Sequence, residues 1–446
     1  MNCLRVPQIM MPKEGTDLYK WSVIACDQYT SQPEYWKETE EIVGTAASAL
    51  HLILPEVYLE EADEAERVAE IHQTMEKYLA DGTLQQQPKG FMLVERSFGK
   101  KYSRCGLVVE IDLEAYEYKK GAHSLVRPTE MTVEERIPPR LRVRQKAAVE
   151  LPHIMLLIDD PDCTVIEPLM AAKNRYQQIY DTELMQKGGH ISGWLIPEGE
   201  ITDDIMLKIE QLAEPETFRE RYHLKEDYPL LNFAVGDGNH SMATAKAAWE
   251  NIKKDLTEEE KKNHPARFCL CEVVNIQDKS LEIEPIHRVV FNVDEEELLC
   301  AAGKYYEEQG CRLIIADETQ LEEAGGQAKP DVKGDVIHSF TLCSARGRKI
   351  LKVLNSKWGI AVAALQSFLD DFLASHSESR IDYIHGMDVV EQLGMKEGNV
   401  GIFLPEVLKE DLFIGVIKDG VLPRKTFSMG EANEKRYYME CKKICK

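Results

Sequence analysis

Short apolar runs alternate along this chain with longer segments that place apolar residues at helical spacing. The apolar runs predict buried strands at residues 90–95, 106–111, 153–158, 191–196, 230–235 and 267–276. The segments of helical spacing predict helices at residues 32–44, 60–80, 167–186, 202–213, 242–253 and 361–374. Strands that alternate with helices favour an α/β or mixed α+β fold.

The length of the chain predicts more than one folding unit. At 446 residues it exceeds the size at which a single hydrophobic core usually stops growing. We expect an N-terminal α/β region at residues 1–150 and a core region at residues 151–292. A smaller α+β lobe is expected at residues 293–356, followed by a C-terminal helix and strands at 357–446 that pack back on the core.

The charge of the chain limits its partners. Hydrophobic residues make up 43% of the sequence, which is enough for well-packed cores, and the formal net charge is −23. Such an acidic protein repels nucleic acid and anionic membrane surfaces. No apolar stretch approaches the roughly 20 residues of a membrane-spanning helix. The expected partner is therefore a small molecule, and the sequence leaves the oligomeric state open.

Eleven cysteines are scattered along the chain without a disulfide or ligand pattern. The sequence contains no C-x-x-C pair, which argues against a disulfide framework and a zinc ribbon. The first residues also lack the basic-then-apolar arrangement of a signal peptide. We therefore expect reduced cysteines, a cytoplasmic protein, and no zinc, haem or flavin site.

The strongest candidate for a functional centre is the turn from Gly236 to Ser241. It joins a predicted buried strand to a predicted helix, and its glycines permit positive φ and close approach of a ligand. A helix start presents unpaired N–H groups that suit a phosphate or carboxylate. Asp237 and His240 add a base or metal ligand and a proton carrier. A tight turn capped by Asn239 explains the same pattern without a ligand.

The segment around this turn resembles a known family signature. Residues Asp237 to Ser241, followed by Ala243-Thr244-Ala245, are similar to the D-G-H-H-R-x-x-T-A signature of the family called domain of unknown function 1015. The resemblance extends over nearly the whole chain. Its supporting segments are Ala25-Cys26-Asp27-Gln28-Tyr29, Arg127-Pro128-Thr129-Glu130-Met131-Thr132, Pro285-Ile286-His287-Arg288-Val289-Val290 and Leu422-Pro423-Arg424-Lys425-Thr426-Phe427.

This resemblance implies both a fold and a ligand. The family is distantly similar to free serine kinase and to the ParB and sulfiredoxin proteins, in which the equivalent loop and helix start hold nucleotide phosphates. It implies a ParB/sulfiredoxin-like core with a mixed sheet, and ADP or ATP with Mg²⁺ as the ligand. Gly236, Gly238, Asn239 and Ser241 would surround the phosphates. Asn239 and Ser241 replace a histidine and an arginine of the signature, so its natural bidentate phosphate partner is missing.

The supporting segments carry the other candidate residues. Glu130 matches the carboxylate of the family's H-E-x-T pattern, and a carboxylate near a substrate hydroxyl can act as general base. The remaining candidates for phosphate or ligand binding are Arg127, Thr132, His287, Arg288 and Lys425. Simpler roles also explain these segments: a capped turn around Glu130, and ion pairing of His287 and Arg288 with neighbouring acids.

A basic stretch at residues 136–146 offers a substitute for the missing arginine. If the stretch is extended, Arg140, Arg142 and Arg144 lie on one face and can clamp a phosphate. A solvated edge strand, whose charges prevent association between sheets, is the favoured explanation. Asp27 ends a predicted apolar run, where substrate-facing residues often lie in open α/β sheets.

Two functions from different classes fit these features. The first is a nucleotide-dependent phosphotransferase or nucleotide hydrolase acting on a small polar metabolite, with Glu130 or Asp237 as base. The second is a non-catalytic regulatory protein that binds a nucleotide or metabolite. The charge of the chain disfavours a nucleic-acid partner, and a zinc hydrolase is disfavoured because no second histidine lies at ligand spacing from His240.

Overall fold

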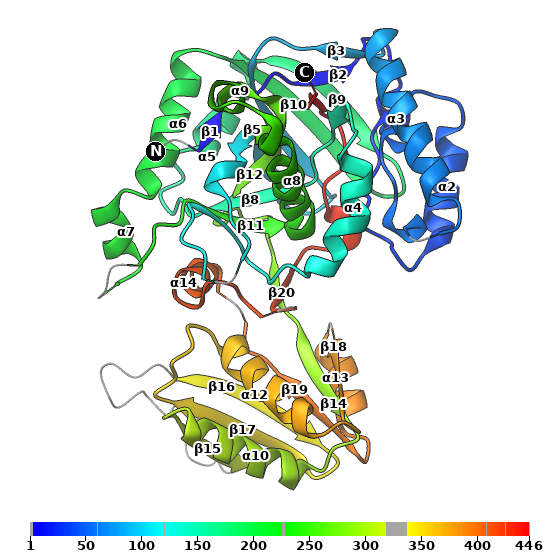
Figure 1. Ribbon diagram of the computed structural model, residues 1–446. Helices are drawn as coiled ribbons and strands as arrows, with labels where there is room; N and C mark the ends of the chain where they lie inside the picture. The colour runs from blue at the N-terminus through cyan, green and yellow to red at the C-terminus, as the bar shows by residue number, and fades with distance from the viewer. Residues whose placement is uncertain are drawn as a thin grey trace. The chain divides into compact units, whose positions relative to one another are not determined.

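The chain folds into two compact units, one of which is inserted into the sequence of the other. The computed structural model describes residues 3–59, 61–119, 121–224, 228–317, 337–384, 386–406, 408–423 and 425–445 (Figure 1). The first unit comprises Met1–Glu282 and Met429–Lys446, and the second comprises Ile283–Ser428. Arg424, which belongs to the C-terminal family motif, lies outside the described residues.

A nine-stranded sheet forms the centre of the first unit. Its strands run in the order β6-β11-β8-β12-β5-β4-β10-β9, and β1 also pairs with β5 (Figure 1). β6 is parallel to β11 and β8 is parallel to β12, whereas the other pairs are antiparallel. The prediction of a mixed α/β fold is therefore confirmed. The strands are β1 (Leu4–Arg5), β4 (Gly90–Ser97), β5 (Arg104–Asp112), β6 (Val126–Pro128), β8 (Met155–Ile158), β9 (Gln177–Leu184), β10 (Gly189–Pro197), β11 (Phe233–Asp237) and β12 (Phe268–Asn275).

Alternating side chains divide the core of this unit into two layers. Phe91 and Leu93 of β4 join one apolar cluster, and Met92 and Val94 join the other, because successive side chains of a strand point to opposite faces. Residues of α5 (Ile166–Ala171), α6 (Glu200–Leu212) and α8 (Asn239–Ile252) complete the first cluster, and residues of α2 (Pro33–Val43) and α3 (Glu64–Ala80) complete the second. The sheet is thus buried on both faces.

The shorter elements of the unit are α1 (Leu18–Trp21), β2 (Met10–Pro12), β3 (Leu84–Gln86), α4 (Ile137–Arg144), β7 (Val149–Glu150), α7 (Pro215–Arg221), α9 (Glu258–Asn263) and β21 (Lys442–Lys443).

The basic stretch at 136–146 is helical, so the extended conformation considered for it is wrong. Helix α4 has prolines in its first turn, where the missing N–H group costs no hydrogen bond. A helix does not align every second side chain, so the three arginines do not form one clamp. They form separate ion pairs, Arg140 with Glu56, Arg142 with Glu64 and Arg144 with Glu150.

Residues 167–186 are only partly helical, so the single long helix expected there is wrong. Helix α5 ends at Ala171, and β9 follows as a strand antiparallel to β10. The buried residues of β9 are Tyr180 and Leu184. A spacing of four residues repeats one face of a helix and equally one face of a strand, so this apolar pattern did not distinguish the two.

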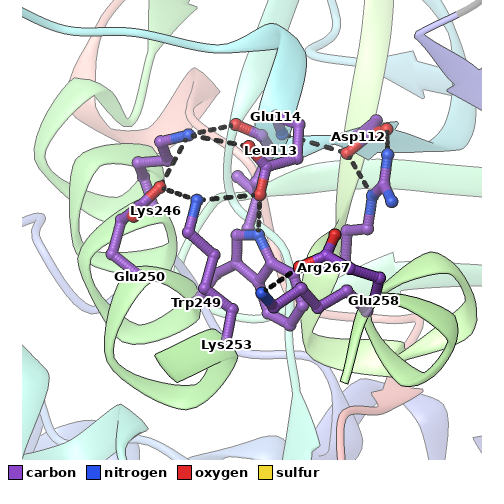
Figure 2. A network of polar contacts seen from close by, with 10 residues as sticks. Asp112, Leu113, Glu114, Lys246, Trp249, Glu250, Lys253, Glu258 and Arg267 are labelled. Atoms are coloured by element: carbon purple, nitrogen blue, oxygen red, sulfur yellow. Dashed lines mark hydrogen bonds and ion pairs between the residues drawn. The ribbon is translucent and has the colours of Figure 1, made fainter. Parts of the chain in front are cut away.

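Helix α8 is anchored along its length by the network in Figure 2. Glu114, just beyond the end of β5, accepts hydrogen bonds from Trp249 Nε1 at 2.6 Å and from Lys253 Nζ at 2.9 Å. Lys246 Nζ donates to the Leu113 carbonyl at 2.9 Å. These contacts fix the helix to the sheet and thereby hold the preceding turn in place.

The second unit has its own six-stranded antiparallel sheet, in the order β15-β17-β16-β19-β14-β18. Residues 293–356, expected as a small lobe, supply α10 and the strands β15, β16 and β17, and the other three strands come from either side of that range. Across the described part of the chain, every helix is too short or too polar to traverse a bilayer. The elements of the unit are β13 (Ile283–Pro285), β14 (His287–Phe291), α10 (Glu295–Glu308), β15 (Arg312–Asp317), β16 (His338–Ser344), β17 (Gly347–Leu354), α12 (Ala361–Ser375), β18 (Arg380–Ile384), α13 (Met387–Gly394), β19 (Asn399–Phe403), α14 (Lys409–Asp419) and β20 (Phe427–Met429), which pairs with β13.

Candidate functional site

The turn between β11 and α8 needs its glycines for steric reasons. Gly238 has a φ of 80°, and a Cβ added there would lie 3.0 Å from the Ile154 Cα atom. A Cβ added to Gly236 would lie 2.7 Å from the Met429 Cε atom and 2.8 Å from the Leu157 Cγ atom. Close packing and a left-handed backbone therefore account for both glycines. The turn brings the start of α8 against the sheet.

The N-terminus of α8 is uncapped. No side chain among the described residues accepts a hydrogen bond from its first turn, and that turn contains no acid. The N–H groups of Asn239, His240 and Ser241 therefore have no partner within the helix. The side-chain oxygen of Asn239 is buried and also has no hydrogen-bond partner among the described residues. A helix start of this kind favours an anion.

Three cations lie near this helix start. Lys435 Nζ is 3.3 Å from an Asp237 carboxylate oxygen, and both side chains are partly exposed. Helix α4 packs against α8 (Figure 1) and brings Arg136 and Arg140 close enough to influence the His240 ring. Arg140 already pairs with a glutamate, whereas exposed Arg136 forms no ion pair with another described residue. Arg136 is therefore available to an anion at the turn.

His240, the second residue of α8, is kept neutral by its surroundings. Its Nε2 accepts a hydrogen bond from the Val133 N–H at 3.3 Å, so the ring proton lies on Nδ1. Burial, followed by the charges of Arg140 and Arg136, lowers the pKa of His240 to about 4, against an opposing effect of Asp27. At neutral pH this imidazole therefore acts as a hydrogen-bond donor through Nδ1.

A second carboxylate, that of Asp27, lies in the same neighbourhood. Burial alone would raise the pKa of Asp27, but the His153 imidazole, a hydrogen bond from Gln28 and the charge of Lys435 together hold it below its usual range. His153 Nε2 is 3.7 Å from Asp27 Oδ2. A Cβ at Gly238 would lie 3.5 Å from the His153 ring, which places this pair beside the turn. Asp27 is thus an ionised carboxylate close to the helix start.

Sequence reasoning did not select three of the residues around this turn: His153, Lys435 and Tyr438. Tyr438 hydroxyl lies 2.7 Å from His153 Nδ1. The one available signal was the position of His153 as the polar first residue of an apolar run. Lys435 and Tyr438 lie in the stretch Lys435-Arg436-Tyr437-Tyr438, which mixes cations with aromatic residues and is not one of the family segments.

The segment that carries Glu130 runs alongside the same strand. β6 is parallel to β11, and Thr129 Oγ1 donates to the Val235 carbonyl at 2.6 Å. Glu130, the next residue, is half-buried. Thr132 is buried, and its hydroxyl has no hydrogen-bond partner within the described part of the chain. The structure therefore brings Glu130 and Thr132 to the sheet edge formed by β6 and β11.

Arg127 is directed at the backbone of a neighbouring loop. It is 2% exposed and donates to the carbonyls of Pro229 at 3.0 Å and Leu230 at 3.3 Å. Burial lowers the pKa of its guanidinium to about 10. This geometry orders the chain before β11 and so supports the turn indirectly.

The other three candidates belong to the second unit. Arg288 is fully buried and its Nε donates to Gln366 Oε1 at 3.2 Å. His287 is also buried, and its Nδ1 accepts a hydrogen bond from the Leu404 N–H at 3.1 Å. Lys425 is exposed and has a positive φ of 58°. His287 and Arg288 are therefore engaged in the packing of their own unit.

A cavity of about 390 Å³ lies in the second unit at the start of α12. Its lining is largely apolar, with His338 and Asp411 among the polar residues, and its volume is within the range of small-molecule sites. None of the candidate residues predicted from the sequence lines it. Among the described residues, no group of three or more His, Cys, Asp or Glu is arranged to hold a metal ion.

Comparison with known proteins gives a family and weak structural likenesses. A family model described as protein of unknown function (DUF1015) matches residues 8–372. None of the curated proteins compared matches the sequence. A mutant free serine kinase in complex with AMP is similar to the chain with a TM-score of 0.38 and 11% identity, covering 76% of this chain and 92% of that chain.

Two further solved structures are similar at the same level. A conserved hypothetical protein from Pyrococcus furiosus has a TM-score of 0.33 and 10% identity over 76% of this chain and 95% of that chain. SbnI with a C-terminal truncation from Staphylococcus aureus has a TM-score of 0.30 and 9% identity over 72% and 82%. At these TM-scores no residue role is transferred from them.

Proposed function

This chain belongs to the DUF1015 family of proteins of unknown function, and for it we propose a nucleotide-dependent phosphotransferase or nucleotide hydrolase that acts on a small polar metabolite. The observation that carries the proposal is the uncapped N-terminus of α8, with cations around it and ionised Asp27 beside it. Free N–H groups, a positive helix end and basic side chains are the features that bind phosphate.

Each group at the turn has a place in such a site. The N–H groups of Asn239, His240 and Ser241 would hold phosphate oxygens. Arg136 would supply the positive charge that the family signature places at Ser241. In phosphoryl transfer the protein acts mainly by positioning groups and neutralising charge, so these donors account for most of what the reaction requires.

The reaction also needs a carboxylate to accept the proton of the attacking hydroxyl. Asp237, Glu130 and Asp27 are the candidates at this sheet edge. Asp237 also fits as a ligand for Mg²⁺, because nucleotide-bound Mg²⁺ takes one or two carboxylates and fills its other positions with phosphates and water. The ion, when bound with a nucleotide, would neutralise phosphate charge.

A non-catalytic regulatory protein is the second candidate. The ion pair between Asp237 and Lys435 favours it, since it engages the carboxylate at the centre of the turn. Such a protein would bind a nucleotide or metabolite at the same helix start without turning it over.

A thermal-shift series with ADP, ATP and CTP, with and without Mg²⁺, tests the proposal. A ligand that binds only the folded state raises the melting temperature, so at least one nucleotide should do so. Arg136→Gln should weaken that effect, whereas Lys146→Gln, the same charge change at the far end of the basic stretch, should leave it intact. If no nucleotide stabilises the protein, the phosphotransferase or hydrolase proposal is wrong.

Turnover separates the two candidates. Asp237→Asn and Glu130→Gln should abolish nucleotide turnover while the nucleotide still raises the melting temperature. Stabilisation by a nucleotide without any turnover in the unchanged protein would support the regulatory candidate.

A further inference from the structure

Tyr438, His153 and Asp27 form a line of polar contacts in the first unit. The Tyr438 hydroxyl lies 2.7 Å from His153 Nδ1 and accepts a hydrogen bond from the Cys26 N–H at 3.1 Å. On the other side of the ring, His153 Nε2 faces Asp27 Oδ2 at 3.7 Å. Tyr438 is 1% exposed and His153 is 8% exposed, so these contacts are shielded from solvent.

The protons that Cys26, Tyr438 and His153 carry bear on which atom is the donor in each of these contacts. A backbone N–H can only donate, so the Tyr438 oxygen accepts from Cys26. Burial raises the pKa of Tyr438 well above its usual value, so the phenol keeps its proton, and the geometry points to His153 Nδ1, at 2.7 Å, as the acceptor of that proton. A neutral imidazole carries a single ring proton. That proton therefore lies on Nε2, the nitrogen that faces Asp27.

The same C-terminal segment, residues 435–438, also holds the other carboxylate of the site. Lys435 pairs with Asp237 at 3.3 Å. The segment is fixed by backbone hydrogen bonds to the residues that precede Asp27: the Ala25 N–H donates to the Arg436 carbonyl at 2.9 Å, and the Tyr438 N–H donates to the Val23 carbonyl at 2.8 Å. Segment 435–438 therefore reaches both acids. Lys435 contacts Asp237 directly, and Tyr438 reaches Asp27 through the His153 ring.

We propose that Tyr438 is a positioning residue of this site. Its hydroxyl holds His153 in the Nε2–H tautomer, which directs an N–H at Asp27 Oδ2 across 3.7 Å and so acts on that carboxylate electrostatically rather than through a hydrogen bond. Together with Lys435 it makes segment 435–438 the element that sets the geometry of both acids. The inference rests on the proposed function only in assigning Asp27 to the reaction, because the tautomer of His153 is a property of the free protein.

Other charged groups also face Asp27 and bear on its ionisation. Lys435, and His153 in its protonated form, favour the charged form of Asp27, and Glu56 opposes it. Glu56 is itself paired with Arg140 at 2.5 Å, and His240 lies within electrostatic reach. A change at Tyr438 alters none of these charges. Its effect on Asp27 therefore has to pass through the His153 ring or through the Cys26 N–H, the two partners of the Tyr438 hydroxyl.

Nitrogen NMR of protein labelled with ¹⁵N-histidine tests the proposal directly. At about pH 8, above the ordinary range of imidazole protonation, we expect a His153 spectrum dominated by the Nε2–H tautomer, assigned by its loss in His153→Asn. Tyr438→Phe removes the donor to Nδ1 and should raise the Nδ1–H population several-fold. An Nδ1–H tautomer in the unchanged protein would overturn the proposal, whether or not the variant folds.

Tyr437→Phe is a matched control for the loss of a buried hydroxyl. Tyr437 is also 1% exposed, and its hydroxyl donates to the Met185 carbonyl at 3.0 Å. This variant should leave the His153 tautomer unchanged. If Tyr438→Phe also leaves it unchanged, Tyr438 does not position His153 and the proposal is wrong.

Kinetics connect the inference to the reaction. Tyr438→Phe should change the pH at which nucleotide turnover is lost on the acid side of its pH profile, and Tyr437→Phe should leave that pH unchanged. If nucleotides neither bind nor turn over, the proposed function fails while the NMR result still decides the role of Tyr438.

Discussion

Arg96 on β4 lies directly opposite Arg104 on β5, and both guanidinium groups are buried. Like charges at opposed positions of an antiparallel pair normally destabilise a sheet. Here Glu272, on the neighbouring strand β12, lies 3.7 Å from Arg104, and both arginines donate to backbone carbonyls of residues 433–434. Acceptors from β12 and from the C-terminal segment therefore offset part of this repulsion, whereas Arg96 Nε, Arg96 Nη1 and Arg104 Nε are buried without a hydrogen-bond partner among the described residues.

Removing the Glu272 charge should be strongly destabilising. Glu272 also pairs with Arg436, and both side chains are 2% exposed. Glu272→Gln leaves buried Arg104 without its carboxylate and removes one of the two carboxylates that pair with Arg436, and it should lower the free energy of unfolding by about 3–5 kcal/mol, measured by urea unfolding. Glu282→Gln, at a glutamate that is 60% exposed, should change it by less than about 0.5 kcal/mol. A loss below about 1 kcal/mol for Glu272→Gln would contradict this account.

The same carboxylate predicts sensitivity to acid. Burial alone would raise the pKa of Glu272, but Arg436, Arg104 and Arg96 hold it below the ordinary value of 4.5. A lowered folded-state pKa contributes stability that is present above the unfolded value and lost as pH falls through the folded one. The free energy of unfolding should therefore fall below about pH 4.5. Urea unfolding across a pH series should show a shallower fall for Glu272→Gln.

His240 predicts a second pH dependence, at higher pH. Its pKa is about 4 in the folded protein, against an ordinary value of 6.5. Between these values the unfolded chain binds more protons, so the free energy of unfolding should decrease as pH falls from about 6.5 to about 4. His240→Gln should reduce that slope. His123→Gln, at an exposed histidine, should leave the slope unchanged, and equal slopes for all three proteins would disprove the assignment.

The network around Glu114 should contribute measurably to the anchoring of α8 (Figure 2). Glu114 is 38% exposed, so solvent weakens its ion pairs, but its hydrogen bond to Trp249 Nε1 is short and partly buried. Glu114→Ala should lower the free energy of unfolding by about 1 kcal/mol. Glu258→Ala removes only an ion pair with Lys261 from a side chain that is 87% exposed, and should have almost no effect. Equal losses for the two variants would contradict the anchoring role.

Ser241 allows stability and ligand binding to be separated. An acid near a helix N-terminus stabilises the helix by about 0.3–1 kcal/mol, so Ser241→Asp should raise the melting temperature of the free protein. The same charge repels phosphate and should abolish stabilisation by a nucleotide. Ser241→Asn, which adds a side chain of similar size without charge, should retain that stabilisation. Undiminished nucleotide binding by Ser241→Asp would exclude α8 as the phosphate site.

The central turn could be predicted because its features are local. A buried strand, a left-handed glycine and a helix follow one another within a few residues, and each has a recognisable sequence pattern. Strands β4, β5, β8, β10 and β12 were predictable for the same reason, as runs of buried residues. The helical form of α4 was not predicted, because arginines at every second position also fit one face of a strand, whereas the prolines at its start fit the first turn of a helix.

The way in which the groups around the turn come together could not be predicted, because they come from distant parts of the chain. Asp27, His153 and Lys435 meet only after the sheet has formed and the C-terminal segment has paired with residues 23–25. No spacing rule connects such positions in a single sequence. Arg288 shows the same limit, since its motif did not reveal that its guanidinium is buried and donates to Gln366.

The interruption of the first unit by the second imposes an order of assembly. Residues 283–428 are translated before residues 429–446, although only the latter complete the first unit. While a ribosome is still making the second unit, Asp237 lacks Lys435 and His153 lacks Tyr438. A chain that stops anywhere in that interval lacks both contacts, and Asp237 and His153 gain these partners only after the whole second unit has been synthesised.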